Sequence, residues 1–305
     1  MGIAIEVFEL TKRYAGRAVV DRLSFSVEEG EVFALLGRNG AGKTTTVEIL
    51  EGYRTADSGR ARVLGLDPVR DRGKLRPHTG LMLQSGGLYP QVTPREALHL
   101  FASFYPRADD PAALLDRLEL TPVGNVRFRQ LSGGQRQRLN LGLALIGRPR
   151  LVFLDEPTAS MDPQARHATW AIIRDLQARG TTVMLTTHFM DEAEQLANRV
   201  AIVDHGRLLA LDAPARLRQG VGNAIRFATQ PAVAEAEVAS LLGVSPADVE
   251  REIDGTLVVR IEASPDVICR LATWLAERGV LLTELRAGSR TLEQAFLDLT
   301  ESSQP

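Results

Sequence analysis

The sequence has 305 residues, of which 44% are hydrophobic, so it is long enough for two domains with packed cores. Its formal net charge of −2 argues against a nucleic-acid-binding surface as the main purpose, and we expect no nucleic-acid partner. The single cysteine, Cys269, excludes a disulfide framework, and no apolar run approaches the roughly 18 residues that span a bilayer. The apolar neighbours of Cys269 predict a small buried thiol.

The N-terminal part predicts strands that lead into a phosphate-binding loop. Segments 3–8 and 18–27 alternate as edge strands do, and 31–36 is an apolar run typical of a buried parallel strand. The next eight residues match the complete pattern G-x-x-x-x-G-K-[ST]. They are Gly37, Arg38, Asn39, Gly40, Ala41, Gly42, Lys43 and Thr44.

Each part of this loop suits phosphate chemistry. The glycines let the backbone turn tightly with its N–H groups pointing inward, and residues 42–50 predict a helix whose N-terminus adds partial positive charge. Lys43 is expected to reach the β- and γ-phosphates, and the Thr44 hydroxyl to ligate Mg²⁺. The chain has only three lysines, and a compact ammonium suits the loop better than a guanidinium.

Gln84 follows the short apolar segment 80–83. Its side-chain carbonyl is suited to ligate Mg²⁺ and to lose that contact when the nucleotide leaves. A glutamine after a strand does not by itself indicate a ligand site. The interpretation of Gln84 depends on its position between the phosphate loop and the motif described next.

The most informative motif is an LSGGQ string at the start of a predicted helix. Its residues are Leu131, Ser132, Gly133, Gly134 and Gln135. Ser132 as N-cap and Gln135 three residues later predict a capping box. Two glycines in a first turn weaken a helix by about 1 kcal/mol each, which indicates that the backbone here approaches an anion.

Two further apolar runs end in polar residues at the same predicted sheet edge. Run 151–154 ends in Asp155 and Glu156, and run 181–187 ends in His188. Ligands bind beyond the carboxyl ends of strands in open parallel sheets. We therefore expect Asp155 to hold Mg²⁺, Glu156 to act on the attacking water, and His188 to contact the γ-phosphate.

The C-terminal part restarts the pattern after a predicted hairpin at 203–208. It predicts the order β-α-β-β-α-β, a ferredoxin-like α+β domain with an added terminal helix. The expected strands are 224–228, 249–253, 256–261 and 280–285, and the expected helices are 232–242, 265–278 and 291–299. We place the first domain at 1–219, its helical subdomain at about 85–148, and the accessory domain at 222–305.

The ordered motifs resemble the ATP-binding cassette (ABC) ATPases over roughly residues 3–217. The resemblance implies an α/β cassette with an antiparallel edge sheet and a helical subdomain. It makes 37–44 the Walker A loop, Gln84 the Q-loop glutamine, 131–135 the signature, and His188 the switch histidine. It also makes 151–155 the Walker B strand, followed by the catalytic Glu156.

The resemblance extends to residues that the motifs alone do not single out. Tyr14 stands where the family stacks an aromatic ring on adenine, and Thr45 adds to the expected ATP contacts. Residues 159–162 correspond to the D-loop, with Met161 in place of the usual leucine and Asp162 retained. Since no catalytic position is replaced, the resemblance implies an active ATPase that uses ATP and Mg²⁺, with Lys43, Glu156 and His188 as catalytic residues.

Segments 87–93 and 289–296 carry a narrower resemblance to drug-export ATPases of the daunorubicin-resistance type. It implies a homodimer around two ATP, working at the inner face of the cell membrane on a separate permease that exports a drug-like or lipid-like substrate. An importer ATPase and a soluble ABC ATPase of translation or repair remain as alternatives at this stage.

Overall fold

The computed structural model describes residues 2–82, 88–159, 161–219, 224–252, 254–288 and 291–301. The chain forms two compact units, Met1–Pro214 and Ala215–Pro305. The domain boundary predicted at 219–222 falls slightly later in the chain. No helix within the described ranges is both long and apolar enough to cross a membrane.

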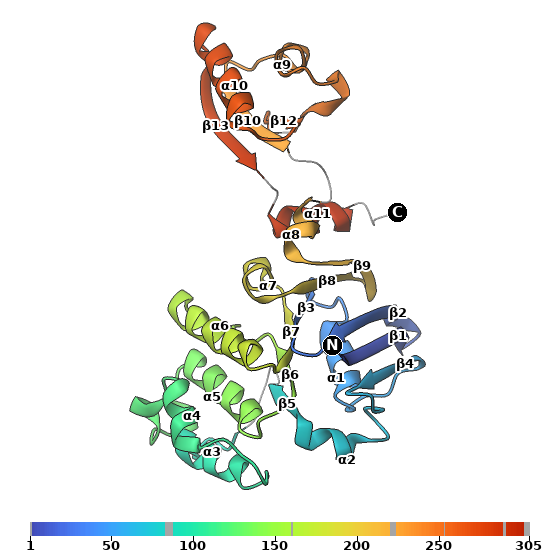
Figure 1. Cartoon of the computed structure of the whole chain (residues 1–305), viewed down its shortest axis with the longest axis vertical. Helices are drawn as coiled ribbons and strands as arrows, with labels where there is room; N and C mark the ends of the chain where they lie inside the picture. Colours follow the sequence, from blue (N-terminus) through green and yellow to red (C-terminus); the bar gives the residue numbers. More distant parts are fainter. Residues whose placement is uncertain are drawn as a thin grey trace. The chain divides into compact units, whose positions relative to one another are not determined.

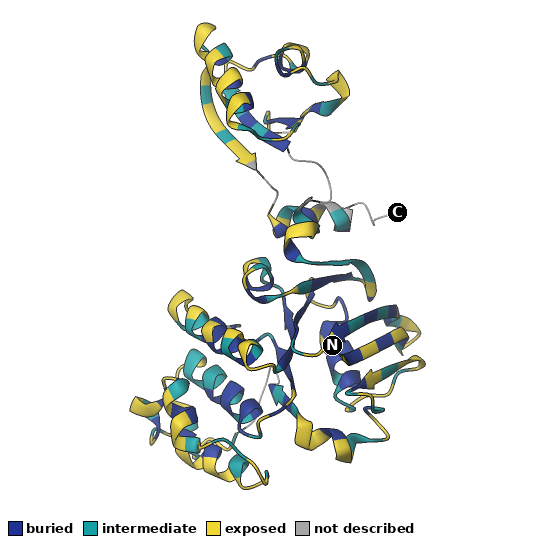
Figure 2. Ribbon diagram, in the orientation of Figure 1, coloured by how far each residue is buried: buried dark blue, intermediate teal, exposed yellow. Residues whose placement is uncertain are grey.

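A six-stranded sheet forms the centre of the first unit, in the order β5-β6-β7-β3-β8-β9 (Figure 1). Its strands are β3 (Val32–Leu36), β5 (Thr79–Met82), β6 (Leu151–Asp155), β7 (Thr182–Thr187), β8 (Arg199–Asp204) and β9 (Arg207–Asp212). All neighbours are parallel except β8 and β9, which form the predicted hairpin. Every residue of β3, β6 and β7 is buried (Figure 2). The carboxyl ends of these three strands therefore share one edge.

A second, antiparallel sheet has the order β2-β1-β4. Its strands are β1 (Ile3–Tyr14), β2 (Arg17–Glu28) and β4 (Ser58–Val63). The first two are longer than the predicted 3–8 and 18–27, because register shifts break the alternation while pairing continues. The core lies between this sheet and the central one, where the Phe25 ring stacks on Phe33 at 5.2 Å.

Helices join these strands. They are α1 (Lys43–Leu50), α2 (Arg72–Leu75), α3 (Pro94–Ala102), α4 (Pro111–Arg117), α5 (Gly133–Leu145), α6 (Pro163–Ala178) and α7 (Met190–Leu196), and α8 (Pro214–Gln219) follows β9 where the second unit of the chain begins. Helices α3, α4 and α5 follow one another between β5 and β6 and lie together (Figure 1). The capping box predicted for α5 is confirmed, since Ser132 and Gln135 bond to each other's backbone N–H groups.

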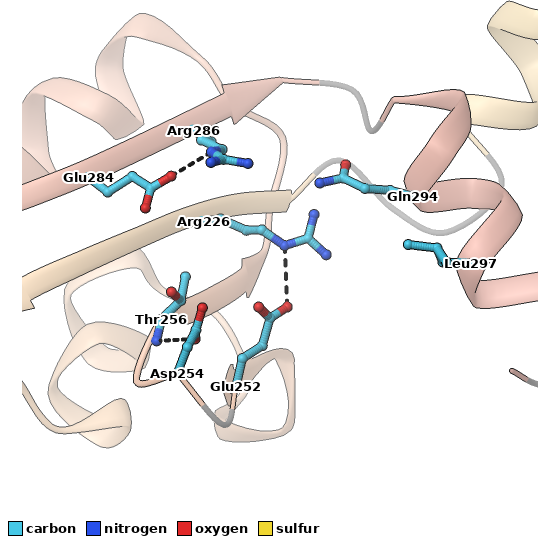
Figure 3. A pocket seen from close by; sticks show the side chains of 8 residues that line it. All are labelled: Arg226, Glu252, Asp254, Thr256, Glu284, Arg286, Gln294 and Leu297. Atoms are coloured by element: carbon cyan, nitrogen blue, oxygen red, sulfur yellow. Dashed lines mark hydrogen bonds and ion pairs between the residues drawn. The ribbon is translucent and has the colours of Figure 1, made fainter. Parts of the chain in front are cut away.

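The second unit contains a four-stranded antiparallel sheet in the order β11-β12-β10-β13. Its elements are β10 (Ala224–Gln230), α9 (Glu235–Leu242), β11 (Val249–Arg251), β12 (Leu257–Arg260), α10 (Pro265–Glu277), β13 (Leu281–Gly288) and α11 (Leu292–Glu301). Alternate residues of β10, Ile225 and Phe227, enter the apolar core. Arg226 between them faces a polar cleft, where its Nε lies 3.4 Å from a Glu252 oxygen (Figure 3).

Two expectations for this unit are wrong. Helix α9 begins at Glu235 rather than 232, since Ala234 is extended and serves as its N-cap. Cys269 is exposed, not buried. In α10 the buried residues are Val267, Leu271 and Leu275, spaced by four, so a residue two positions from Val267 points away from the core.

Candidate nucleotide site

The loop 37–44 connects the buried strand β3 to helix α1 and bounds a cavity of about 240 Å³. Gly42 is the N-cap of α1 with φ 97°. A Cβ there would lie 2.3 Å from the Val19 carbonyl oxygen, so only glycine fits. The cavity is lined by Val19, Asn39, Gly40, Gly42, Lys43, Thr44, Thr45 and Glu156.

Lys43 is buried beside this cavity, with 5% of its surface exposed. Its Nζ donates to the carbonyl oxygens of Gly37 (2.7 Å) and Arg38 (3.2 Å). Burial lowers the pKa of Lys43, while Glu156 and Asp155 act to raise it. The ammonium is thus held in the loop by neutral acceptors and two nearby carboxylates, where an anionic phosphate would be a strong partner.

Asp155 ends β6 and is 4% exposed. Its carboxylate accepts hydrogen bonds from the hydroxyls of Thr44, at 3.3 Å, and Thr186. Burial raises the pKa of Asp155, and the bond from Thr186 opposes the shift. A carboxylate and a hydroxyl from two elements, next to the phosphate loop, form an oxygen donor set that fits Mg²⁺.

Glu156 and His188 lie together at the ends of neighbouring strands. His188 Nδ1 is 3.0 Å from Glu156 Oε1, and Glu156 also lines the cavity. The backbone of Glu156 has φ 50°, and its N–H donates to the carbonyl and hydroxyl oxygens of Thr186, both at 3.1 Å. A non-glycine residue in this left-handed region is often part of a functional site. The arrangement places an acid–base pair beside the phosphate loop.

The signature has a different setting. Ser132 and Gly133 are exposed at the N-terminus of α5, and no described signature residue lines the phosphate-loop cavity. A Cβ on Gly134 would meet nothing closer than the Ala165 Cβ at 3.7 Å. Packing within the described part of this chain therefore does not require glycine at 134.

The remaining expected residues are also peripheral to the cavity. Tyr14 ends β1 and is 39% exposed, with its ring 5.7 Å from both Lys12 Nζ and the Arg54 guanidinium. Asp162 caps α6 by accepting from the Ala165 N–H at 2.9 Å. Gln84 and the D-loop residue Ser160 lie outside the described residues.

Sequence reasoning missed two members of the site. Thr186 bonds both Asp155 and the Glu156 N–H, and Val19 reaches the loop from the antiparallel sheet. The only signal for Thr186 was a hydroxyl near the end of the strand that precedes His188. No local pattern could place Val19, because it reaches the site through sheet packing.

Comparisons with known proteins agree on one family. The family described as ABC transporter matches residues 20–159. The chain is 36% identical over 310 residues to daunorubicin resistance ATP-binding protein DrrA3 of Streptomyces coeruleorubidus, covering 97% of this chain and 96% of the relative. It is 43% identical over 221 residues to Nod factor export ATP-binding protein I of Paraburkholderia xenovorans (strain LB400), covering 70% and 72%.

A solved structure shows the same fold in the first unit. It is a dimeric, post-hydrolysis state of the ATP-binding cassette MJ0796 bound to ADP and Pi, with a TM-score of 0.64 and 23% identity. The match covers 68% of this chain and 98% of that one.

Proposed function

This chain belongs to the ATP-binding proteins of ABC transporters, and we propose that its cavity at the phosphate loop holds the ATP that it hydrolyses. The chain is the ATP-hydrolysing subunit of an exporter and energises a membrane permease. The observation that carries the assignment of the site is the 3.0 Å contact between Glu156 and His188 beside Lys43.

In this proposal the phosphate loop binds the triphosphate. Backbone N–H groups of residues 37–44 and the N-terminus of α1 face the phosphates, and Lys43 moves its hydrogen bonds from loop carbonyls to phosphate oxygens. Thr45 adds a contact from the cavity wall, and Tyr14 stacks on the adenine ring. The Lys12 ammonium and the Arg54 guanidinium already lie near the Tyr14 ring.

Glu156 then orients and deprotonates the attacking water, and His188 holds that water and the γ-phosphate in place. The hydrogen bond to His188 keeps Glu156 Oε1 at the cavity, and the backbone bonds to Thr186 fix its orientation. Thr44, Asp155 and Gln84 would hold Mg²⁺. When bound, that ion neutralises charge on the β- and γ-phosphates.

We propose that a second copy of the chain completes each site. The exposed Ser132 and Gly133 at the N-terminus of α5, and the absence of a clash for a Cβ at Gly134, fit an anion site aimed outside the chain. In a dimer they would cap the γ-phosphate of the opposing copy, with Asp162 near the interface.

The permease is proposed to be a separate chain that docks on the helical subdomain. Tyr89, Leu100 and Phe104 are 81%, 52% and 66% exposed there, as large apolar side chains at a protein interface would be. The names of the relatives support a drug-like or lipid-like cargo, and the permease would hold this subunit at the cytoplasmic face of the membrane.

The second unit is proposed to be a ferredoxin-like accessory domain of residues 222–305. Its strand order, β11-β12-β10-β13, with helices after the first and third strands, supports that assignment.

Glu156→Gln tests the central assignment, because it removes the base and keeps the shape of the side chain. We expect ATP affinity within about threefold of wild type and turnover lower by at least about 100-fold. Fluorescent-nucleotide titration and steady-state phosphate release measure the two. Wild-type turnover in Glu156→Gln would contradict the proposed function.

A further inference from the structure

Glu192 is a fully buried acid that the nucleotide site does not contact directly. It lies in the first turn of α7 and is 0% exposed. An acidic residue in a first turn usually remains in solvent or caps its own helix. Helix α7 has no side-chain cap, so the Glu192 carboxylate serves some other contact.

That contact joins three segments of the cassette. Glu192 Oε1 accepts hydrogen bonds from Thr158 Oγ1 at 2.8 Å and from Trp170 Nε1 at 3.2 Å. Thr158 is also 0% exposed and lies two residues after Glu156, while Trp170 belongs to α6. One oxygen atom thus ties the turn after β6, helix α6 and helix α7 together.

The contact spans both sides of the proposed hydrolytic pair. Glu192 is four residues after His188, on the helix that begins directly beyond it, and Thr158 follows Glu156. The bond between Glu192 and Thr158 therefore links the segment that follows His188 to the segment that follows Glu156. Glu156 and His188 are themselves in contact at 3.0 Å.

The backbone of Glu156 needs such support. Its φ of 50° costs about 1 kcal/mol or more and persists only where neighbouring contacts hold it. Thr186 holds it on one side, through bonds to the Glu156 N–H. On the other side, the Thr158 carbonyl accepts from the Met161 N–H at 3.2 Å and its hydroxyl bonds Glu192.

We propose that Glu192 is a positioning residue for ATP hydrolysis, which fixes the catalytic carboxylate against His188 through Thr158. This inference rests on the proposed function of Glu156 and His188. Burial raises the pKa of Glu192, and hydrogen bonds from Thr187, Thr158 and Trp170 oppose the shift. A neutral glutamine can accept the bonds from Thr158 and Trp170 through its own side-chain oxygen, which makes it the conservative substitution.

The experiment compares kcat and KM for ATP in Glu192→Ala, Glu192→Gln and Thr158→Val. Thr158→Val leaves the buried carboxylate its bond from Trp170, so it removes only the link to the turn after Glu156. We expect kcat to fall by roughly tenfold in Glu192→Ala and Thr158→Val with KM within about threefold, and Glu192→Gln to retain most activity. The double variant Glu192→Ala/Thr158→Val should lose no more than the stronger single variant.

Arg174→Gln is the matched control, because Arg174 also joins α6 to α7, through bonds to Gln195, but away from Thr158. It should keep wild-type kcat. Wild-type kcat in Thr158→Val, or an equal loss in Arg174→Gln, would overturn the positioning role. If Glu192→Ala does not fold, Thr158→Val decides alone. Retained turnover in Glu156→Gln would instead reject the proposed function on which the inference rests.

Discussion

The two ends of this cassette that bear on ATP are built in opposite ways. At the edge where β3, β6 and β7 end, Lys43 and Asp155 are buried, Glu156 is half-buried, and all three are bonded to their own chain. At the start of α5, Ser132 and Gly133 are exposed, and a Cβ on Gly134 would clash with nothing. The half of the proposed site at the phosphate loop is held in place by contacts within the chain. In the other half the N-terminus of α5 is capped, and the proposed anion-binding groups face outward. The contrast supports our proposal that two copies of the chain form one catalytic unit.

Removing the Lys43 charge from the phosphate-loop half of the site should have the largest effect on turnover. Lys43→Ala deletes the ammonium that opposes the β- and γ-phosphate charge, so we expect loss of measurable turnover and ATP affinity weaker by about 10-fold or more. Nucleotide titration and phosphate release measure both. Lys74→Ala is the control, since that ammonium is exposed and paired with Asp71. Equal activities of the two variants would remove Lys43 from the site.

A charge added to the outward half should separate binding from turnover. An acid in the first turn suits the helix dipole, so Gly134→Asp should fold. Facing a γ-phosphate it should reduce turnover by about 100-fold, with ATP affinity within about threefold of wild type. Gly134→Asn has a similar shape without the charge and should lose much less turnover. An equal loss of turnover in Gly134→Asp and Gly134→Asn would show that the added charge is not responsible.

The phosphate-loop side of the cassette also contains Glu51, whose substitution should have a smaller effect, seen in the free energy of unfolding. Both Glu51 carboxyl oxygens are buried without a hydrogen-bond partner among the described residues. Burial, with a smaller contribution from Asp155, raises the Glu51 pKa from 4.5 to about 8. Because the unfolded chain loses this proton first, the free energy of unfolding falls as pH rises from about 4.5 to about 8.

Between pH 6 and pH 8 the wild-type free energy of unfolding should fall by about 2 kcal/mol, and Glu51→Gln should remove that fall. Urea unfolding of the nucleotide-free protein at pH 6 and pH 8 measures it. Glu48→Gln lies one turn earlier on α1, where the carboxylate pairs with Arg54, and should keep the wild-type dependence. The same pH dependence in Glu51→Gln as in wild type would show that this carboxyl is not responsible.

The sequence allowed much of this contrast to be predicted. Apolar runs of strand length located β3, β6 and β7, and their polar last residues identified one edge. The spacing of Ser132 and Gln135 predicted the capping box that the structure contains. These features are local, so they can be read from neighbouring residues.

The features that were missed depend on tertiary contacts. Thr186 acts through strand pairing between β6 and β7, and Glu192 through packing of α6 on α7. The exposure of Cys269 follows from which face of α10 meets the sheet, and its apolar neighbours alone pointed the other way. The periodicity of apolar residues predicts that a helix or strand exists better than it predicts which residues each side chain contacts.

Mixing Lys43→Ala with Gly134→Asp tests most directly whether each site is built from two chains. Alone, each variant lacks one half of every site. In a mixed dimer, one site combines the intact phosphate loop of one copy with the intact signature of the other, so random exchange should restore up to about a quarter of wild-type turnover. Activity in the mixture well above the sum of the separate variants is the result the account predicts. Activity equal to that sum, with dimer exchange verified by differently labelled copies, would contradict a site shared between two chains.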